Sequence, residues 1–374
     1  MSKSILYGGG YQAVNFTLLI VQALFLPRYL GLEQYGSGLY LLLPVLFLGG
    51  VWEPIAQRFC ISGDGIPSAW WKRGIPVVFL GYLGCLFFLV PPGSDGVFVY
   101  LLGMFFLGEY IFSIYCVAVL QAQKNYALIF FLSLSGLVLS GATLTVGNAY
   151  WLVCLFYSAY FLPVFLYGIL VVKGRGGASV THRGSLGGVL DAISTRLFYV
   201  FVNNFYVILI GVFFGPAKAA VFRIVISFSS AFRFCNPLSI GHFYSMVHGT
   251  NFKKKIQYSL LPLAFFYIGV LVVWALLPWL AGYGQALLGE NYYAVHDFFL
   301  DVLWFIPLYL WSPYLSIVFF ASLGWKIIFC ISAVALSIAT VFIYFDNLQL
   351  FFGAACALYC SFILLSGMFK EMRG

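Results

Sequence analysis

Apolar segments of about twenty residues recur along the whole chain, and this pattern restricts the fold more than any other feature of the sequence. A helix needs about 20 predominantly apolar residues to cross the hydrocarbon core of a bilayer. Between the apolar segments lie short polar stretches rich in glycine, lysine and arginine. The pattern therefore predicts an all-α polytopic membrane protein.

Composition supports the same fold class. Charged residues make up 8% of the 374, and mean hydropathy is +1.00, whereas soluble domains carry about 25% charged residues. With about 20 apolar residues per spanning helix and a connection after each, the chain divides into roughly twelve helix-plus-loop units and leaves nothing over for a soluble domain. We therefore expect the function to lie within the membrane.

The apolar runs predict helices at 8–30, 38–61, 75–91, 97–121, 127–146, 149–172, 187–213, 217–245, 257–281, 295–320, 325–344 and 348–369. Successive helices alternate sides, so basic residues can be assigned to sides. One side receives Lys3, Arg58, Lys72, Arg73, Lys124, Lys173, Arg175, Arg183, Lys253, Lys254, Lys255, Lys326, Lys370 and Arg373. The other receives Arg28 and Lys218. The positive-inside rule then predicts a multi-pass protein with both termini in the cytoplasm.

The longest polar connection, 174–186, predicts a cytoplasmic linker between two six-helix bundles, 1–173 and 187–374. Because six is even, both bundles begin on the same side, as in transporters built from parallel repeats. A weak internal similarity agrees with this arrangement, since glycine turns at Gly31 and Gly215 follow the first and seventh helices.

Three arginines, Arg196, Arg223 and Arg233, lie inside segments that should cross the bilayer. Charged residues in the membrane normally face a bundle interior or a cavity and mark substrate or ion pathways. The guanidinium group stays charged and matches phosphate oxygens two at a time. These residues predict an anionic substrate.

Polar residues near these arginines recur at helical spacing. At about 100° per residue, Arg196 and Asn203 share one face, and Arg223, Ser227 and Ser230 share another. Gln12, Asn15 and Gln22 form a third group in the first helix. The residues expected to line a substrate cavity are Arg196, Arg223, Arg233, Asn203, Asn204, Gln22 and Asn15.

Acidic residues in or beside the spans are Glu53, Glu109, Asp191, Asp297 and Asp301. Two interpretations remain open. The carboxylates could pair with arginines and stabilise helix packing, because an unpaired charge at mid-bilayer costs at least about 2.5 kcal/mol. Alternatively, they could bind the protons or sodium ions that drive transport. We expect no other cofactor and no metal site.

Three segments carry a resemblance to a known family: Leu26–Gly36 after the first helix, Val207–Gly215 at the end of the seventh, and Leu287–Tyr292 before the tenth. In order and placement they resemble the polysaccharide-export branch of the MOP flippase superfamily. This superfamily includes Wzx-type O-antigen flippases, the lipid II flippase and MATE drug exporters. Asn203-Asn204 stand where relatives often carry an aspartate.

The resemblance implies two helix bundles around a central cavity that opens alternately to each side. It implies a flippase that moves an undecaprenyl-diphosphate-linked oligosaccharide, such as an O-antigen, capsule or exopolysaccharide repeat unit, across the inner membrane. The partners would be this lipid-linked substrate, membrane lipids, and the glycan polymerase and glycosyltransferases of the same pathway. No nucleic-acid partner is expected.

Three other functions compete with this one. A MATE-like cation-coupled exporter should have a cavity dominated by carboxylates and aromatics. A membrane-embedded glycan polymerase or ligase usually has a long extracytoplasmic loop, whereas no outer connection here is long. A scaffold without transport activity would leave the polar groups unexplained. Because the chain lacks a Walker glycine loop, a His-Glu-x-x-His motif and a CxxC pair, we expect no catalytic residues and no enzymatic activity.

Overall fold

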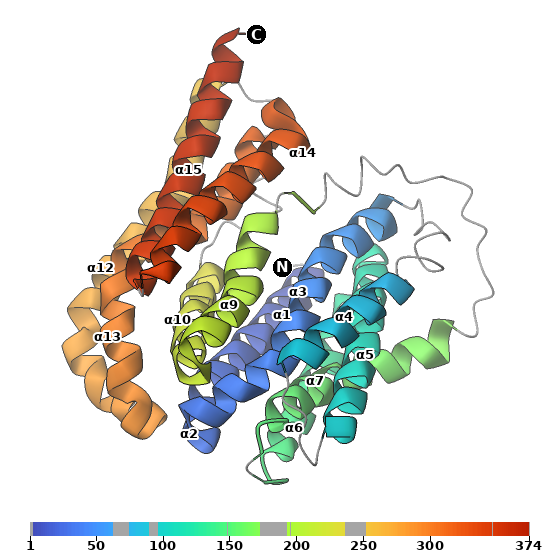
Figure 1. Cartoon of the computed structure of the whole chain (residues 1–374). Coiled ribbons are helices and arrows are strands. Elements are labelled where there is room, and N and C mark those ends of the chain that lie inside the picture. The colour runs from blue at the N-terminus through green and yellow to red at the C-terminus, as the bar shows by residue number, and fades with distance from the viewer. Residues whose placement is uncertain are drawn as a thin grey trace. The chain divides into compact units, whose positions relative to one another are not determined.

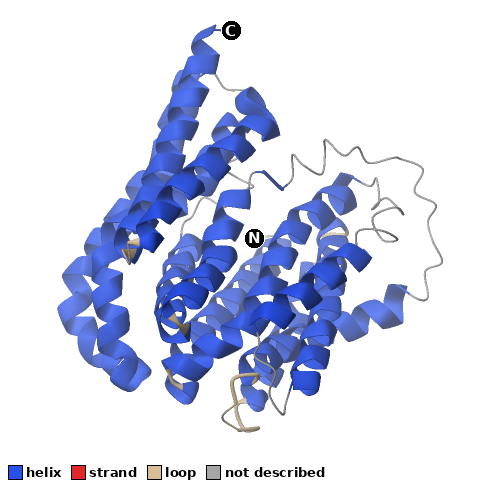
Figure 2. Ribbon diagram, viewed as in Figure 1, coloured by secondary structure: helices blue, strands red, loops and turns tan. Residues whose placement is uncertain are grey.

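The computed structural model describes residues 3–62, 75–89, 96–147, 149–172, 193–194, 196–235, 252–345 and 347–373. Within these ranges the regular secondary structure is entirely helical (Figures 1 and 2). Nine stretches of these residues are long and apolar enough to cross a membrane, and one of them, Lys254–Phe319, is 66 residues long and contains several helices. The predicted all-α polytopic fold is confirmed.

Contacts divide the chain into two compact units. The first contains 1–22, 29–193 and 204–220, and the second contains 23–28, 194–203 and 221–374. The first and seventh predicted helices therefore each contribute to both units. The predicted linker 174–186 lies outside the described residues, as does the end of the eighth predicted helix after residue 235.

The helices that begin the chain are α1 (Lys3–Ile20), the π-helical η1 (Val21–Phe25), α2 (Leu26–Leu30), α3 (Leu32–Ser62), α4 (Ile75–Leu89), α5 (Gly96–Ala122), α6 (Tyr126–Thr143) and α7 (Leu152–Val172). In the first unit α5 packs against α3 and α7, while α6 packs against α1 and α7. Aromatic side chains fill this core, and Tyr82, Phe106 and Phe156 are fully buried.

The seventh predicted helix is represented by the span Arg196–Phe214, which contains the π-helical η3 (Phe201–Phe205) and α9 (Tyr206–Phe214). The helices that follow are α10 (Pro216–Cys235), α12 (Phe252–Leu288), η4 (Gly289–Asn291), α13 (Tyr292–Val302), η5 (Leu303–Phe305), α14 (Ile306–Tyr344) and α15 (Leu348–Arg373). Gly324 interrupts α14 with a positive φ of 72°, so the two predicted helices on either side of it are distinct.

The core of the second unit lies between α14 and α15, where Tyr309, Tyr314 and Tyr359 are almost completely buried. In contrast, α12 exposes many large apolar side chains, including Leu271, Trp274 and Trp279. A helix with so much apolar surface is suited to contact with lipid.

Two glycine turns are extremely short. Gly31 alone connects α2 to α3, and Gly215 alone connects α9 to α10. Their φ angles are +78° and +90°, which lie in the left-handed region that only glycine enters at low cost. In the first unit the two turns also lie close together, because a Cβ added to Gly36 would lie 2.0 Å from the carbonyl oxygen of Pro216.

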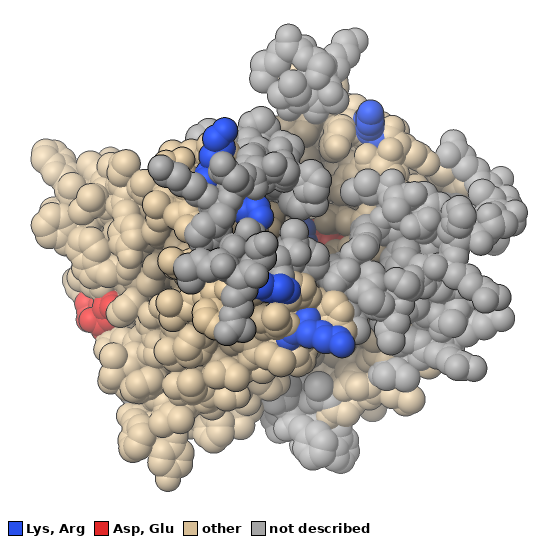
Figure 3. Space-filling model, turned by 90° about the horizontal axis from the view of Figure 1, so that it is seen from above, with Lys and Arg blue, Asp and Glu red and all other residues tan. Residues whose placement is uncertain are grey.

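Charge is sparse on the surface formed by the described residues. On the face seen in Figure 3, Lys and Arg side chains are found at more places than Asp and Glu side chains, and most of the remaining coloured surface is uncharged. This distribution agrees with a net formal charge of +8.

Candidate functional site

The π-helical segment η3 carries two buried amides, Asn203 and Asn204, each 6% exposed. Asn203 Nδ2 donates to the carbonyl oxygen of Tyr199 at 2.8 Å and also to the hydroxyl of Tyr309. The Asn204 Oδ1 atom is buried and has no hydrogen-bond partner. A π-helical turn inserted in an α-helix often marks a functional site, because it disrupts the regular backbone hydrogen bonds.

Arg223 of α10 lies next to this segment and is 6% exposed. Its Nη1 atom donates to the backbone carbonyl oxygen of Asn203 at 2.7 Å, while its Nε atom has no partner. No carboxylate of the described residues forms an ion pair with this guanidinium group. A buried charge normally needs a paired counter-ion, and without one it costs several kcal/mol. Arg223 is therefore a buried cation that can accept an anionic partner.

Hydroxyl groups continue this polar cluster. Tyr199 donates to Ser230 at 3.0 Å, and Ser230 and Tyr309 share a further hydrogen bond at 3.3 Å. The rings of Tyr199 and Tyr309 are stacked with centroids 5.3 Å apart. The hydroxyl of Ser227 is buried without a partner. The predicted face with Arg223, Ser227 and Ser230 is thus entirely buried, and we call it, with Tyr199, Asn203 and Tyr309, the arginine cluster.

The other predicted residues of this region are placed differently. Arg196 is half-buried, and Arg233 lies in α10 with its side chain outside the described residues. The predicted common face of Arg196 and Asn203 assumed uniform α-helical rotation. That assumption is wrong, because η3 begins at Phe201 and a π-helical turn takes more residues per turn than an α-helical one.

The first unit buries an amide in the same kind of segment. Gln22 of η1 is fully buried, donates through Nε2 to the hydroxyl of Tyr35 at 3.0 Å, and accepts a hydrogen bond from the hydroxyl of Tyr157. Asn15 accepts from the hydroxyl of Tyr160 at 2.8 Å. Gln12 is exposed, so the predicted group of three amides in the first helix contains only Asn15 and Gln22.

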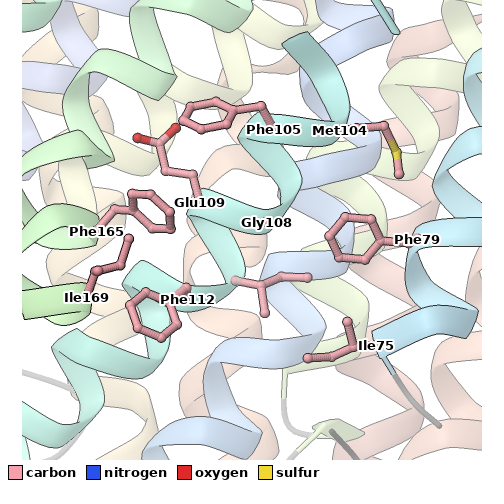
Figure 4. Close-up of a pocket in the computed structure, with 10 residues that line it drawn as sticks. Ile75, Phe79, Met104, Phe105, Gly108, Glu109, Phe112, Phe165 and Ile169 are labelled. Atoms are coloured by element: carbon pink, nitrogen blue, oxygen red, sulfur yellow. The ribbon is translucent and has the colours of Figure 1, made fainter. Parts of the chain in front are cut away.

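Glu109 lies at the centre of α5 and is 1% exposed. Ser158 donates to its Oε2 atom, while the Oε1 atom has no hydrogen-bond partner. The residue borders an apolar cavity of about 390 Å³ whose walls include Phe105, Phe112 and Phe165 (Figure 4). A carboxyl group can take up and release a proton, and the described residues of the apolar wall around Glu109 offer no charged group that would bind the carboxylate.

The remaining predicted acidic residues differ from Glu109 in exposure. Glu53 is half-buried and accepts from Gln57 Nε2 at 3.0 Å. Asp297 and Asp301 are exposed, where Asp297 contacts His296 at 3.2 Å and Asp301 accepts from Gln349. Asp191 lies outside the described residues. In the part of the chain that the structure describes, no three metal-binding side chains form a group.

Sequence comparison finds no relatives for this chain. No family model matches it, and no curated protein matches it.

Comparison with solved structures shows the fold. An inward-facing multidrug resistance MATE family transporter of the MOP superfamily is similar with a TM-score of 0.62 and 12% identity, covering 100% of this chain and 95% of that one. The eukaryotic MATE transporter AtDTX14 is similar with a TM-score of 0.60 and 16% identity, covering 99% and 97%. An outward-facing multidrug resistance MATE transporter has a TM-score of 0.50 at 12% identity. The chain is therefore a multi-pass membrane protein with the fold of MATE transporters.

Proposed function

We propose that this protein is an alternating-access flippase that moves an undecaprenyl-diphosphate-linked oligosaccharide across the bacterial inner membrane. The observation that carries the proposal is Arg223, a buried arginine inside an apolar chain with no carboxylate partner among the described residues. Such a charge is costly to retain, and binding to an anion in transit would explain its presence. A diphosphate has the charge and the oxygen geometry that a guanidinium group prefers.

The arginine cluster offers such a substrate hydrogen-bonding groups as well as a positive charge. Among the described residues, the Nε atom of Arg223 and the Oδ1 atom of Asn204 have no hydrogen-bond partner. The Nε atom can donate to a phosphate oxygen, and the Oδ1 atom can accept from a sugar hydroxyl, without first losing a hydrogen bond. The Nη1 atom can exchange the Asn203 carbonyl for a phosphate oxygen, which forms a stronger, charge-assisted bond. We assign further substrate contacts to Arg196, Arg233 and Asn15. Gln22, predicted from the sequence as a substrate residue, is fully buried and bonded to Tyr35 and Tyr157, and we assign it to helix packing.

Glu109 is the proposed coupling residue. Among the described residues its hydrogen-bond partner is Ser158 alone, and the cavity beside it is lined by aromatic and aliphatic side chains. A metal cation would need several oxygen ligands, which this wall does not offer. We therefore favour a proton over sodium. Glu53, Asp191, Asp297 and Asp301 are assigned to charge balance, and both termini are assigned to the cytoplasm.

A second candidate function is the export of small cations, as in MATE transporters, and the structural neighbours favour it. It predicts efflux of a cationic dye from a pump-deficient strain that expresses this protein. The flippase predicts instead that deletion of the gene leaves lipid-linked oligosaccharide in the inner leaflet. Robust dye efflux together with normal surface glycan in the deletion strain would exclude the flippase.

Direct binding tests the role of Arg223. We expect the full-length protein in nanodiscs to bind undecaprenyl diphosphate, and the Arg223→Gln variant to bind it roughly tenfold to hundredfold more weakly. This factor corresponds to about 1.5–3 kcal/mol for a hydrogen bond to a charged group. Lys218→Gln is the matched control, because Lys218 belongs to the same helix and is exposed. Equal weakening by both substitutions would indicate nonspecific charge attraction and contradict the proposal.

A further inference from the structure

An apolar slot of about 260 Å³ lies within the second unit between three helices. Most of its walls are formed by side chains of α10, α12 and α13, among them Val225, Phe228, Leu277, Leu280, Val295 and Phe299, and Leu24 of η1 completes them. The residues that α12 contributes run from Val273 to Leu288. At 1.5 Å per residue this stretch is about 22 Å long, which exceeds the roughly 15 Å of one leaflet's hydrocarbon.

One end of the slot is polar. Tyr283, Tyr292 and His296 line it there. Arg28 lies beside this end, because its Nη1 atom donates to the carbonyl oxygen of Ala286, one residue before the slot-lining Leu287. Asn291 also contacts α2, the helix that contains Arg28, because its Nδ2 atom donates to the carbonyl oxygen of Pro27 at 3.2 Å. A cation therefore lies beside the polar residues of a largely apolar space.

We propose that this slot binds the isoprenoid chain of the lipid-linked substrate, with Arg28 against the phosphate nearest the chain. The inference rests on the flippase function proposed above and adds a separate site for the lipid part. An amphiphile with an apolar chain and an anionic head matches the order of the groups, apolar wall first and cation at the end. Glu290 and Asp297 are the acidic residues of the neighbouring η4 and α13, and they are exposed, as is Arg28. Solvent and salt therefore screen all three charges, and Arg28 is free to contact a head group outside the slot.

The location of the slot suggests which step it serves. In the arginine cluster, Arg223, Ser227 and Ser230 share one face of α10. The slot is lined by Ile224, Val225 and Phe228 of the same helix. At 100° per residue, the mean direction of these three side chains is nearly opposite that of Arg223. The chain and the buried cation therefore occupy different faces of one helix. With both termini cytoplasmic, as proposed, Arg28 and this end of α12 lie in the outer leaflet. The occupant is then the flipped lipid before its release.

Photocrosslinking tests the site. The probe is a polyprenyl diphosphate that carries a diazirine on its chain, applied to the full-length protein in nanodiscs, with labelled peptides mapped by mass spectrometry. We expect labelling of the slot-lining parts of α10 and α12 that excess undecaprenyl diphosphate displaces. Leu277→Trp should fill the slot and lower this labelling at least fivefold. Leu276→Trp is the matched control, because Leu276 is 46% exposed and does not line the slot.

The head group is tested separately. Arg28→Gln should weaken crosslinking of the diphosphate probe several-fold and leave that of a diazirine prenol unchanged.

If Leu277→Trp does not give monodisperse protein, Gly284→Ala serves instead, since the added Cβ would lie 2.5 Å from the Tyr292 ring at the polar end.

Two results would overturn the slot assignment whether or not the protein transports lipid. One is equal labelling of the two tryptophan variants. The other is slot labelling by a diazirine phosphatidylglycerol that undecaprenyl diphosphate does not displace, which would mark ordinary bilayer lipid. Transport with no slot labelling would remove this inference alone. Slot labelling without transport or Arg223-dependent binding would remove the flippase function and leave the chain site in place.

Discussion

Both units bury polar side chains in π-helical segments or beside them, but the two units differ in how fully these side chains are hydrogen-bonded. In the first unit, Gln22 uses both ends of its amide, one for Tyr35 and the other for Tyr157. In the second unit, Asn203 is also bonded to a tyrosine hydroxyl. Within the described part of the chain, however, the Nε atom of Arg223 has no partner and no carboxylate pairs with its guanidinium group. Buried polar groups are normally satisfied unless they have another task. The hydrogen bonds of Gln22 therefore indicate a structural role, whereas the unpaired groups around Arg223 indicate a ligand-binding site.

Substitution of Gln22 should give the largest change in stability. Gln22→Leu removes the hydrogen bonds between Gln22 and the hydroxyls of Tyr35 and Tyr157, and each such bond contributes about 0.5–1.5 kcal/mol. We expect the free energy of unfolding to fall by at least that amount, measured by thermal denaturation in detergent. Binding of undecaprenyl diphosphate per folded molecule should stay the same. A strong loss of binding with unchanged stability would show that this network is also a ligand site.

Removal of the arginine should affect stability less and in the opposite direction. Arg223→Leu deletes a buried charge that lacks a counter-ion, and apolar replacement of buried charges is often neutral or stabilising. We expect the melting temperature to stay level or to rise by a few degrees, even though anion binding is lost. If the melting temperature falls as far as it does in Gln22→Leu, Arg223 is a structural element of its helix bundle.

The smallest stability change should come from Glu109→Gln. Glutamine keeps the length of the side chain and an oxygen for Ser158, so we expect a change of less than about 0.5 kcal/mol. Transport in proteoliposomes should persist but should no longer respond to an imposed pH gradient. Asp297→Asn, at an exposed position, is the control and should keep the response. A variant that still follows the gradient would assign coupling to another carboxylate.

The fold could be predicted largely because it depends on run lengths. About twenty apolar residues can satisfy their backbone in lipid only as a helix, so the spans follow from hydropathy without knowledge of their neighbours. The turns at Gly31 and Gly215 were also visible, since they lie at the ends of two such runs. Likewise, the shared face of Arg223, Ser227 and Ser230 follows from helical rotation alone.

The partners within the site could not be predicted in this way. The tyrosines that hold Gln22 and Asn203 come from 13 to 135 residues away in sequence, and only packing brings them into register. The π-helical segments were also missed, because an extra residue in a turn is stabilised by tertiary contacts and leaves no periodic pattern. The amides themselves were the available signal, since polar side chains are rare inside such apolar runs.

The single-residue turns have a consequence for how the protein is made. A connection of one glycine is too short to form a polar loop that could remain outside the bilayer while the next helix is synthesised. The pairs joined at Gly31 and Gly215 should therefore leave the translocon as preformed hairpins, each entering the bilayer in one event. A few residues inserted after either glycine would separate the two insertion events, and the orientation of every later helix would then depend on its own flanking charges.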